Sequence, residues 1–129
     1  MKKILVADVL QMDARYTAAL GDWQIEFART LGEARHALGH ASFDLAAIGV
    51  YFDDSQMFDL VRWLRASART AELPILCVRG HQGFTAVSTR TLEMAVRALG
   101  ADEFLDLLPS AGAEAEAALR AAAERLLKD

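Results

Sequence analysis

Four charged side chains stand where this sequence is best able to do chemistry. Asp8 follows the first apolar run of the chain, Asp53 and Asp54 follow the third, and Arg79 ends the fourth. A carboxylate can accept a phosphoryl group or bind a cation, and a neighbouring guanidinium can hold it through charge-assisted hydrogen bonds. We therefore expect the side chain of Arg79 to reach toward Asp8, Asp53 or Asp54.

The elements that must position these residues follow from the hydrophobic pattern. Short apolar runs alternate with helix-patterned segments, which is typical of a parallel sheet with helices on both faces. Right-handed crossovers favour a doubly wound α/β sheet, formed by one domain over residues 1–129. We expect the flavodoxin-like type of this fold, in which the strand order is 2-1-3-4-5. We expect strands at residues 4–7, 23–27, 45–50, 75–78 and 104–108, and helices at 12–20, 31–38, 57–66, 88–99 and 109–127.

Capping residues mark where two of the helices begin. Thr30 and Glu33 have the spacing of a capping box, and Gly39 is the expected stop of that helix. Asp54 or Ser55 is expected to cap the helix that starts at residue 57. In doubly wound sheets the functional edge lies at the carboxyl ends of the strands, which is where the charged residues named above are found.

In order and spacing, these segments resemble the receiver domains of two-component response regulators. The resemblance covers almost the whole chain and rests on residues 2–8, 43–49, 59–65, 73–78 and 99–105. It implies a cytoplasmic signal-transduction module of the response-regulator and phosphorelay type. Such a module works through protein–protein contacts.

The resemblance fails at the family's catalytic positions. The family has two adjacent carboxylates after the first strand for a divalent metal, whereas here Asp8 is followed by Val9. The phosphoacceptor aspartate aligns with Gly49. The small hydroxyl residue after the fourth strand is replaced by Arg79, and the lysine that ends the fifth strand is replaced by Leu107.

These replacements remove the groups that phosphoryl transfer to a carboxylate needs. Gly49 offers no nucleophile, Val9 no metal ligand and Leu107 no cation. The expected protein is a degenerate pseudo-receiver with no enzymatic activity, metal or cofactor. Phe104 matches the family's switch aromatic, but with Arg79 in place of its hydroxyl partner we expect Phe104 to pack in the core.

Two alternatives remain open. One is a receiver phosphorylated at a non-standard aspartate, namely Asp8, Asp53 or Asp54. The other is a flavodoxin-like module that binds a small ligand in the crevice beside the first strand. The absence of a glycine-rich phosphate loop at residues 8–12 weighs against the second alternative.

The acidic charge balance of the chain argues against two classes of binding partner. The formal net charge is −4 and the pI about 5.3, with no basic stripe, so we expect neither nucleic acid nor a membrane surface as partner. Cys77 is the only cysteine and lies in an apolar run, so we expect it to be a buried thiol. A single buried thiol suits a reducing compartment such as the cytoplasm. We interpret His36, His40 and His81 as ordinary polar residues.

The remaining expectation is a protein partner. A signalling kinase, an effector or a second copy of the chain would bind the face made by the fourth helix, fifth strand and fifth helix, here residues 89–99, 104–108 and 113–127. The resemblance implies this face. The loop from Gly80 to Ser88 is interpreted either as a partner-binding loop or as a tolerated insertion.

Overall fold

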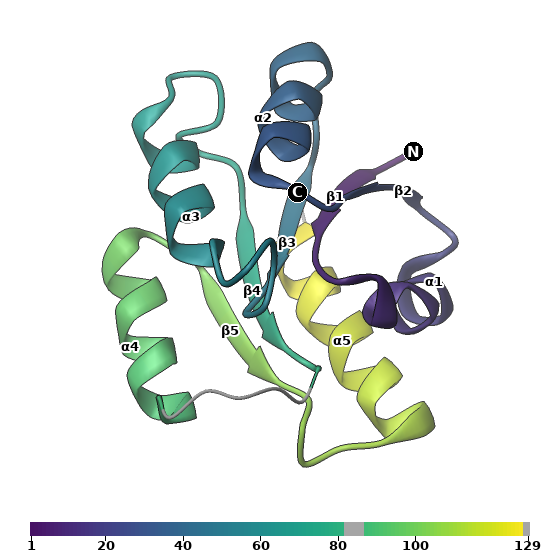
Figure 1. Cartoon of the computed structure of the whole chain (residues 1–129). Coiled ribbons are helices and arrows are strands. Elements are labelled where there is room, and N and C mark those ends of the chain that lie inside the picture. The colour runs from purple at the N-terminus through teal and green to yellow at the C-terminus, as the bar shows by residue number, and fades with distance from the viewer. Residues whose placement is uncertain (82–86, 128–129) are drawn as a thin grey trace.

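The computed structural model describes residues 1–81 and 87–127, in which strands and helices alternate (Figure 1). The strands are β1 (Lys3–Ala7), β2 (Gln24–Ala28), β3 (Leu45–Gly49), β4 (Ile75–Arg79) and β5 (Glu103–Asp106). The helices are α1 (Asp13–Leu20), α2 (Leu31–His40), α3 (Met57–Ala66), α4 (Thr89–Leu99) and α5 (Gly112–Leu127), with a short 3-10 helix, Leu10–Met12, before α1. Most of the loop expected from Gly80 to Ser88 lies outside the described residues.

The strands form one parallel sheet with the predicted order β2-β1-β3-β4-β5. Helices α1 and α5 cover one face, and α2, α3 and α4 cover the other (Figure 1). The doubly wound α/β fold class is thus confirmed. No helix in the described part of the chain is long and apolar enough to cross a membrane.

Each face of the sheet has its own hydrophobic core. In β1, Leu5 and Ala7 pack against the α2–α4 side, whereas Ile4 and Val6 pack against α1 and α5. This alternation follows from the period of two along a strand. Because both faces are covered, the central strands are continuous apolar runs, and Cys77 is fully buried among them as predicted.

The structure confirms the predicted N-cap of α2, but α2 and β5 end at other residues than predicted. Thr30 Oγ1 accepts a hydrogen bond from the Glu33 amide at 3.0 Å, as a helix cap requires. The predicted stop at Gly39 is wrong, because its backbone lacks the left-handed φ of a terminating glycine and α2 continues to His40. The fifth strand ends at Asp106, two residues earlier than expected.

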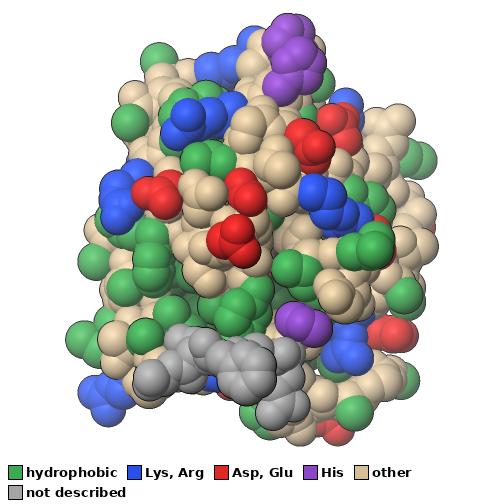
Figure 2. All heavy atoms as spheres, in the orientation of Figure 1, with side chains coloured by type: hydrophobic (Ala, Val, Ile, Leu, Met, Phe, Trp, Pro, Cys, Tyr) green, Lys and Arg blue, Asp and Glu red, His purple; other side chains and the backbone are tan. Residues whose placement is uncertain are grey.

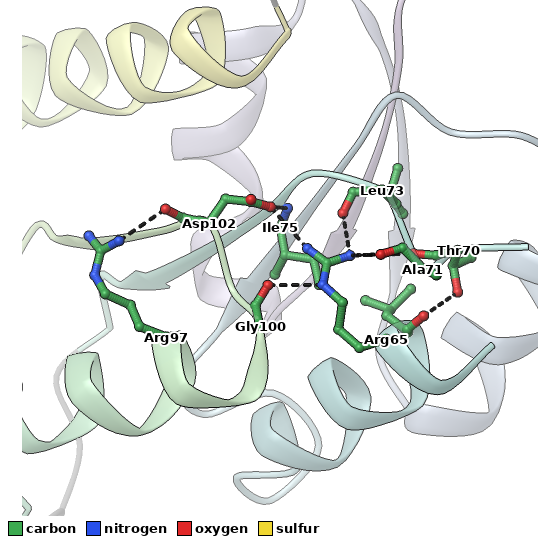
Figure 3. A network of polar contacts seen from close by, with 9 residues as sticks. Arg65, Thr70, Ala71, Leu73, Ile75, Arg97, Gly100 and Asp102 are labelled. Carbon is green, nitrogen blue, oxygen red and sulfur yellow. Dashed lines mark hydrogen bonds and ion pairs between the residues drawn. The ribbon is translucent and has the colours of Figure 1, made fainter. Parts of the chain in front are cut away.

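Arg65, in the last turn of α3, joins three segments at the amino-terminal edge of the sheet (Figure 3). Its Nε donates to the carbonyl of Gly100 at 2.9 Å, and Nη1 donates to those of Ala71 and Leu73 at 3.0 and 2.7 Å. Nη2 pairs with Asp102 at 3.0 Å, and the same carboxylate accepts the first amide of β4 at 2.8 Å. The side chain of Arg65 thus provides hydrogen-bond donors to carbonyl groups in two connections, α3–β4 and α4–β5.

Substituting this arginine tests how much the network contributes. Arg65→Met keeps the apolar stem but leaves part-buried carbonyl groups without a donor, so we expect a loss of about 2–3 kcal/mol in the free energy of unfolding. Arg62→Met is the matched control, because Arg62 is exposed and its one ion pair among the described residues is with Asp59 one turn away, which predicts a loss below about 1 kcal/mol. Urea denaturation of both variants measures the difference, and equal losses would contradict it.

Candidate functional site

The carboxyl ends of β1 and β3 place Asp8 directly over Gly49. The two strands are neighbours, with Ala7 paired to Ile48. Asp8 is 3% exposed, and a Cβ atom added at Gly49 would lie 2.0 Å from Asp8 Cγ and Oδ1. The carboxylate of Asp8 therefore fills the space that any side chain at position 49 would need.

Two donors hold this carboxylate in place. The Val9 amide donates to Oδ1 at 2.7 Å, and the Tyr16 hydroxyl donates to Oδ2 at 2.8 Å. Burial raises the pKa of Asp8 to about 6, although these hydrogen bonds and the nearby charges of His81 and Arg29 act to lower it. Burial and the Asp8 carboxylate raise the pKa of Tyr16 as well, so Tyr16 stays a hydrogen-bond donor.

The cation beside Asp8 is Arg29. It follows β2 directly, and its Nη1 donates to the Asp8 carbonyl at 3.0 Å while Nη2 pairs with Asp13 at the start of α1. Arg29 was not among the predicted site residues, because it follows the edge strand β2 and the predicted site residues lie in or after the other four strands. Tyr16 was also missed, since nothing in its spacing marks it as a partner of Asp8.

The expectation that Arg79 reaches Asp8, Asp53 or Asp54 is wrong. Its Nη1 donates to Thr89 Oγ1 at the start of α4, and that hydroxyl donates to Asp106 Oδ2 at 3.3 Å. The reason is the period of two along β4, which directs Arg79 to the α2–α4 face. Asp8 lies over the opposite face, with Tyr16 of α1.

Two apolar side chains lie close to Gly80 at the same edge of the sheet. A Cβ atom at Gly80 would lie 2.4 Å from Met12 Cε and 3.5 Å from Leu107 Cδ1. Met12 and Leu107 are both buried and belong to the core formed with α1 and α5. Leu107 thus places a hydrocarbon at this edge of the sheet, where the family resemblance implied a lysine.

Asp53 and Asp54 do not enter the pocket. Asp53 Oδ2 accepts the Leu31 amide at 2.8 Å and Gln56 Nε2 at 3.2 Å, so Asp53 caps α2 across the loop. Asp54 is exposed. The predicted cap of α3 at Asp54 or Ser55 is wrong, because Asp53, Asp54 and Ser55 all have positive φ (45°, 54° and 66°) and the N-cap is Gln56.

Aromatic residues complete the surroundings of the site. Phe104 is buried in the core beneath α2, α3 and α4, as predicted. Tyr51 meets His81 edge to face, with ring centroids 6.1 Å apart. Among the described residues the Tyr51 hydroxyl is buried with no hydrogen-bond partner. His81, which follows β4, lies close enough to Asp8 for its charge to act on the pKa of that carboxyl.

Several solved structures that this chain resembles are response regulators or receiver domains. Chemotaxis protein CheY4 of Vibrio cholerae has a TM-score of 0.79 and 22% identity, covering 98% of this chain and 99% of its own. A response regulator from Thermotoga maritima has a TM-score of 0.78 and 15% identity, covering 100% and 99%. The signal receiver domain of a histidine kinase from Syntrophus aciditrophicus has a TM-score of 0.77 and 21% identity, covering 98% and 90%.

These likenesses define the fold class. No protein-family model and no curated protein matches the sequence. The chain has the receiver-domain fold of two-component response regulators, and its structural neighbours are CheY-like receiver domains. At identities below 25% the comparison establishes the fold alone.

A double-mutant cycle tests the contact between Asp8 and Gly49. Gly49→Ala places a methyl group on the Asp8 carboxylate, so we expect it to lower the free energy of unfolding by about 1–3 kcal/mol. In an Asp8→Ala background the clash is gone and the same change should cost little. Equal costs in both backgrounds, measured by urea denaturation, would show that the two groups do not touch.

Gly39→Ala is the matched control for that cycle. Gly39 lies inside α2, and beyond its own helix backbone and chain neighbours no described atom lies within 4 Å of its added Cβ, so the change should stabilise the protein by about 0.5–1 kcal/mol. Its effect should be the same with Asp8 or Ala at position 8.

The raised pKa of Asp8 predicts a pH dependence of stability. The pKa is about 6 in the folded protein against 3.8 ordinarily, so the folded state binds this proton more tightly than the unfolded chain. The contribution of protonated Asp8 to the free energy of unfolding is therefore full below about pH 4, and it is lost as the pH rises through 6. Relative to Asp8→Asn, the wild-type protein should lose up to about 3 kcal/mol between pH 4 and 7. A stability difference that stays constant over this range in denaturation experiments would refute the assignment.

Proposed function

We propose that this chain is a receiver-type signalling module that acts through protein–protein contacts without phosphorylation. The observation that carries the proposal is the buried Asp8 carboxylate over Gly49. In a phosphorylatable receiver the acceptor side chain would project into that space. Here the space is taken by a group that already has two hydrogen-bond donors.

The chemistry at the same edge of the sheet supports the proposal. Phosphoryl transfer needs a nucleophile open to the donor, a metal ion bound by several oxygens and a cation for the phosphoryl charge. Val9 and Leu107 supply neither ligand nor cation, and Arg79 is engaged with Thr89. Arg29 is held by Asp13 and the Asp8 carbonyl. We therefore propose a binding module that is not an enzyme and needs no cofactor.

Exposed apolar residues favour the α4–β5–α5 face as the surface for a protein partner. Val87, Met94 and Leu108 are 43%, 63% and 36% exposed, on or beside α4 and β5. A contact surface needs such apolar anchors within a polar rim. The partner in this proposal is a signalling kinase, an effector or a second copy, in the cytoplasm, where the free buried thiol of Cys77 stays reduced.

The two alternatives have less support. The crevice where a flavodoxin-like protein would hold a small ligand is filled by Asp8, Met12 and Leu107. A hollow of about 420 Å³ lies instead at the opposite edge of the sheet, beside Ser42 and Arg69. A displaced phosphoacceptor at Asp8, Asp53 or Asp54 is an outcome that the following experiment detects.

Treatment with acetyl phosphate and magnesium tests the proposal directly. We expect no gain in intact mass, and no thermal shift with magnesium and beryllofluoride, because the described residues of the pocket offer neither an open carboxylate nor a cluster of metal ligands. A receiver domain that carries the family's two carboxylates, phosphoacceptor aspartate and lysine serves as the positive control.

A gain in mass would overturn phosphorylation independence, and single variants would then locate the acceptor. Loss of the gain in Asp8→Asn would identify the buried carboxylate. Loss in Asp53→Asn or Asp54→Asn would identify the loop after β3.

A further inference from the structure

Two histidines on α2 form a feature that the proposed function does not use. His36 and His40 are four residues apart and exposed, and their ring centroids lie 4.1 Å apart with an interplanar angle of 28°. Figure 2 shows histidine side chains gathered at the end of α2 that is far from the pocket. Residues four apart lie on one side of a helix, so both rings face the same volume of solvent.

The hydrogen bond of His40 prepares its ring to bind a metal. Nδ1 of His40 lies 2.7 Å from the carbonyl oxygen of His36. A carbonyl oxygen only accepts, so Nδ1 carries the proton and Nε2 keeps its lone pair in the neutral ring. Metal-binding histidines are usually held in this way, because the second hydrogen bond fixes both the tautomer and the ring orientation.

We propose that His36 and His40 together chelate one late first-row divalent ion, such as Zn²⁺, Ni²⁺ or Cu²⁺. Imidazole nitrogen is a suitable ligand for these ions. With metal–nitrogen bonds of about 2.1 Å, two nitrogens on one ion are about 3.0–3.4 Å apart in octahedral or tetrahedral geometry. The two stacked rings, with centroids 4.1 Å apart, must turn about their side-chain torsions so that both in-plane lone pairs point at the same ion. Paired histidines at this helical spacing also bind zinc in metalloprotease helices.

The surroundings of the pair favour a cation. His36 lines a shallow hollow of about 410 Å³ together with Glu26 and Glu33. Both carboxylates have other partners, so they contribute negative potential to the hollow and water completes the coordination. His40 is the last residue of α2, where the helix dipole also favours positive charge. Among the described residues no third histidine, cysteine or carboxylate joins the pair.

Calorimetric titration of the untagged full chain with NiCl₂ or ZnCl₂ tests the site. We expect one ion per chain. His36→Gln and His40→Gln should each weaken metal binding by at least about 10- to 100-fold. That is the loss usually seen when a group that only hydrogen-bonds to a metal ligand is removed. The matched control is His81→Gln, which removes a histidine outside the pair and should leave the affinity unchanged. Circular dichroism checks that the variants, all at exposed or half-buried positions, remain folded.

Histidine side-chain NMR supplies an independent readout. Substoichiometric Ni²⁺ should broaden the ring resonances of His36 and His40 together and leave those of His81 sharp. Binding that persists in the double variant, or equal affinity in wild type and either single variant, would overturn the proposal. Half an ion per chain would overturn it as well, because the ion would then be shared between two molecules.

Discussion

The carboxyl edge of the sheet is organised around one buried charge, the carboxylate of Asp8. A carboxylate removed from water must be given donors, and the Val9 amide and Tyr16 hydroxyl provide them. Arg29 binds the carbonyl of the same residue and pairs with the first residue of α1. Because these groups come from β1, α1 and the segment after β2, Asp8 fixes how three elements meet. Gly49 is the counterpart that this arrangement requires, since any side chain there would occupy the same space.

The period of two along the strands divides this edge into two separate polar systems. Asp8 and Tyr16 lie on the α1–α5 side, together with the apolar closure formed by Met12 and Leu107. On the other side, Arg79 of β4 connects through Thr89 to β5 and fixes the start of α4. Among the described residues no side-chain hydrogen bond joins Asp8 or Tyr16 to Arg79, Thr89 or Asp106, so the polar contacts at the start of α4 do not involve the Asp8 carboxylate. A start of α4 that is fixed in this way suits the proposed role of the α4–β5–α5 face, which is to bind a protein partner in one conformation.

The fold could be predicted from the sequence because it depends on repeated signals, whereas the site depends on single contacts. Apolar runs at regular spacing predicted five strands and α3 at Met57–Ala66, and the flavodoxin-like fold class implied the strand order. The direction of Arg79 was also available in principle, since it follows a strand residue that faces α1 and α5. Tyr16 could not be assigned, because a tyrosine in a helix packs as a core residue whether or not its hydroxyl has a partner. The turn from Asp53 to Ser55 has left-handed backbone conformations, which are usually marked by glycine. Because no glycine stands there, nothing in the sequence marks this turn, and a helix cap was predicted at Asp54 or Ser55.

Helix α2 links the two ends of the molecule, and its contacts determine whether they are coupled. Asp53 holds its first turn at the carboxyl edge of the sheet, while His36 and His40 lie at its last turn. A bound ligand shifts a conformational equilibrium only when it binds one state better than the other. One helical turn sets the spacing of the two rings, whereas the negative potential beside the proposed site also depends on Glu26 and Glu33. Glu33 accepts the amide of Arg29, and Arg29 donates to the Asp8 carbonyl, so this potential is linked to the Asp8 pocket. A displacement of Arg29 would change the affinity of the proposed site through that potential and would leave the ring spacing unchanged.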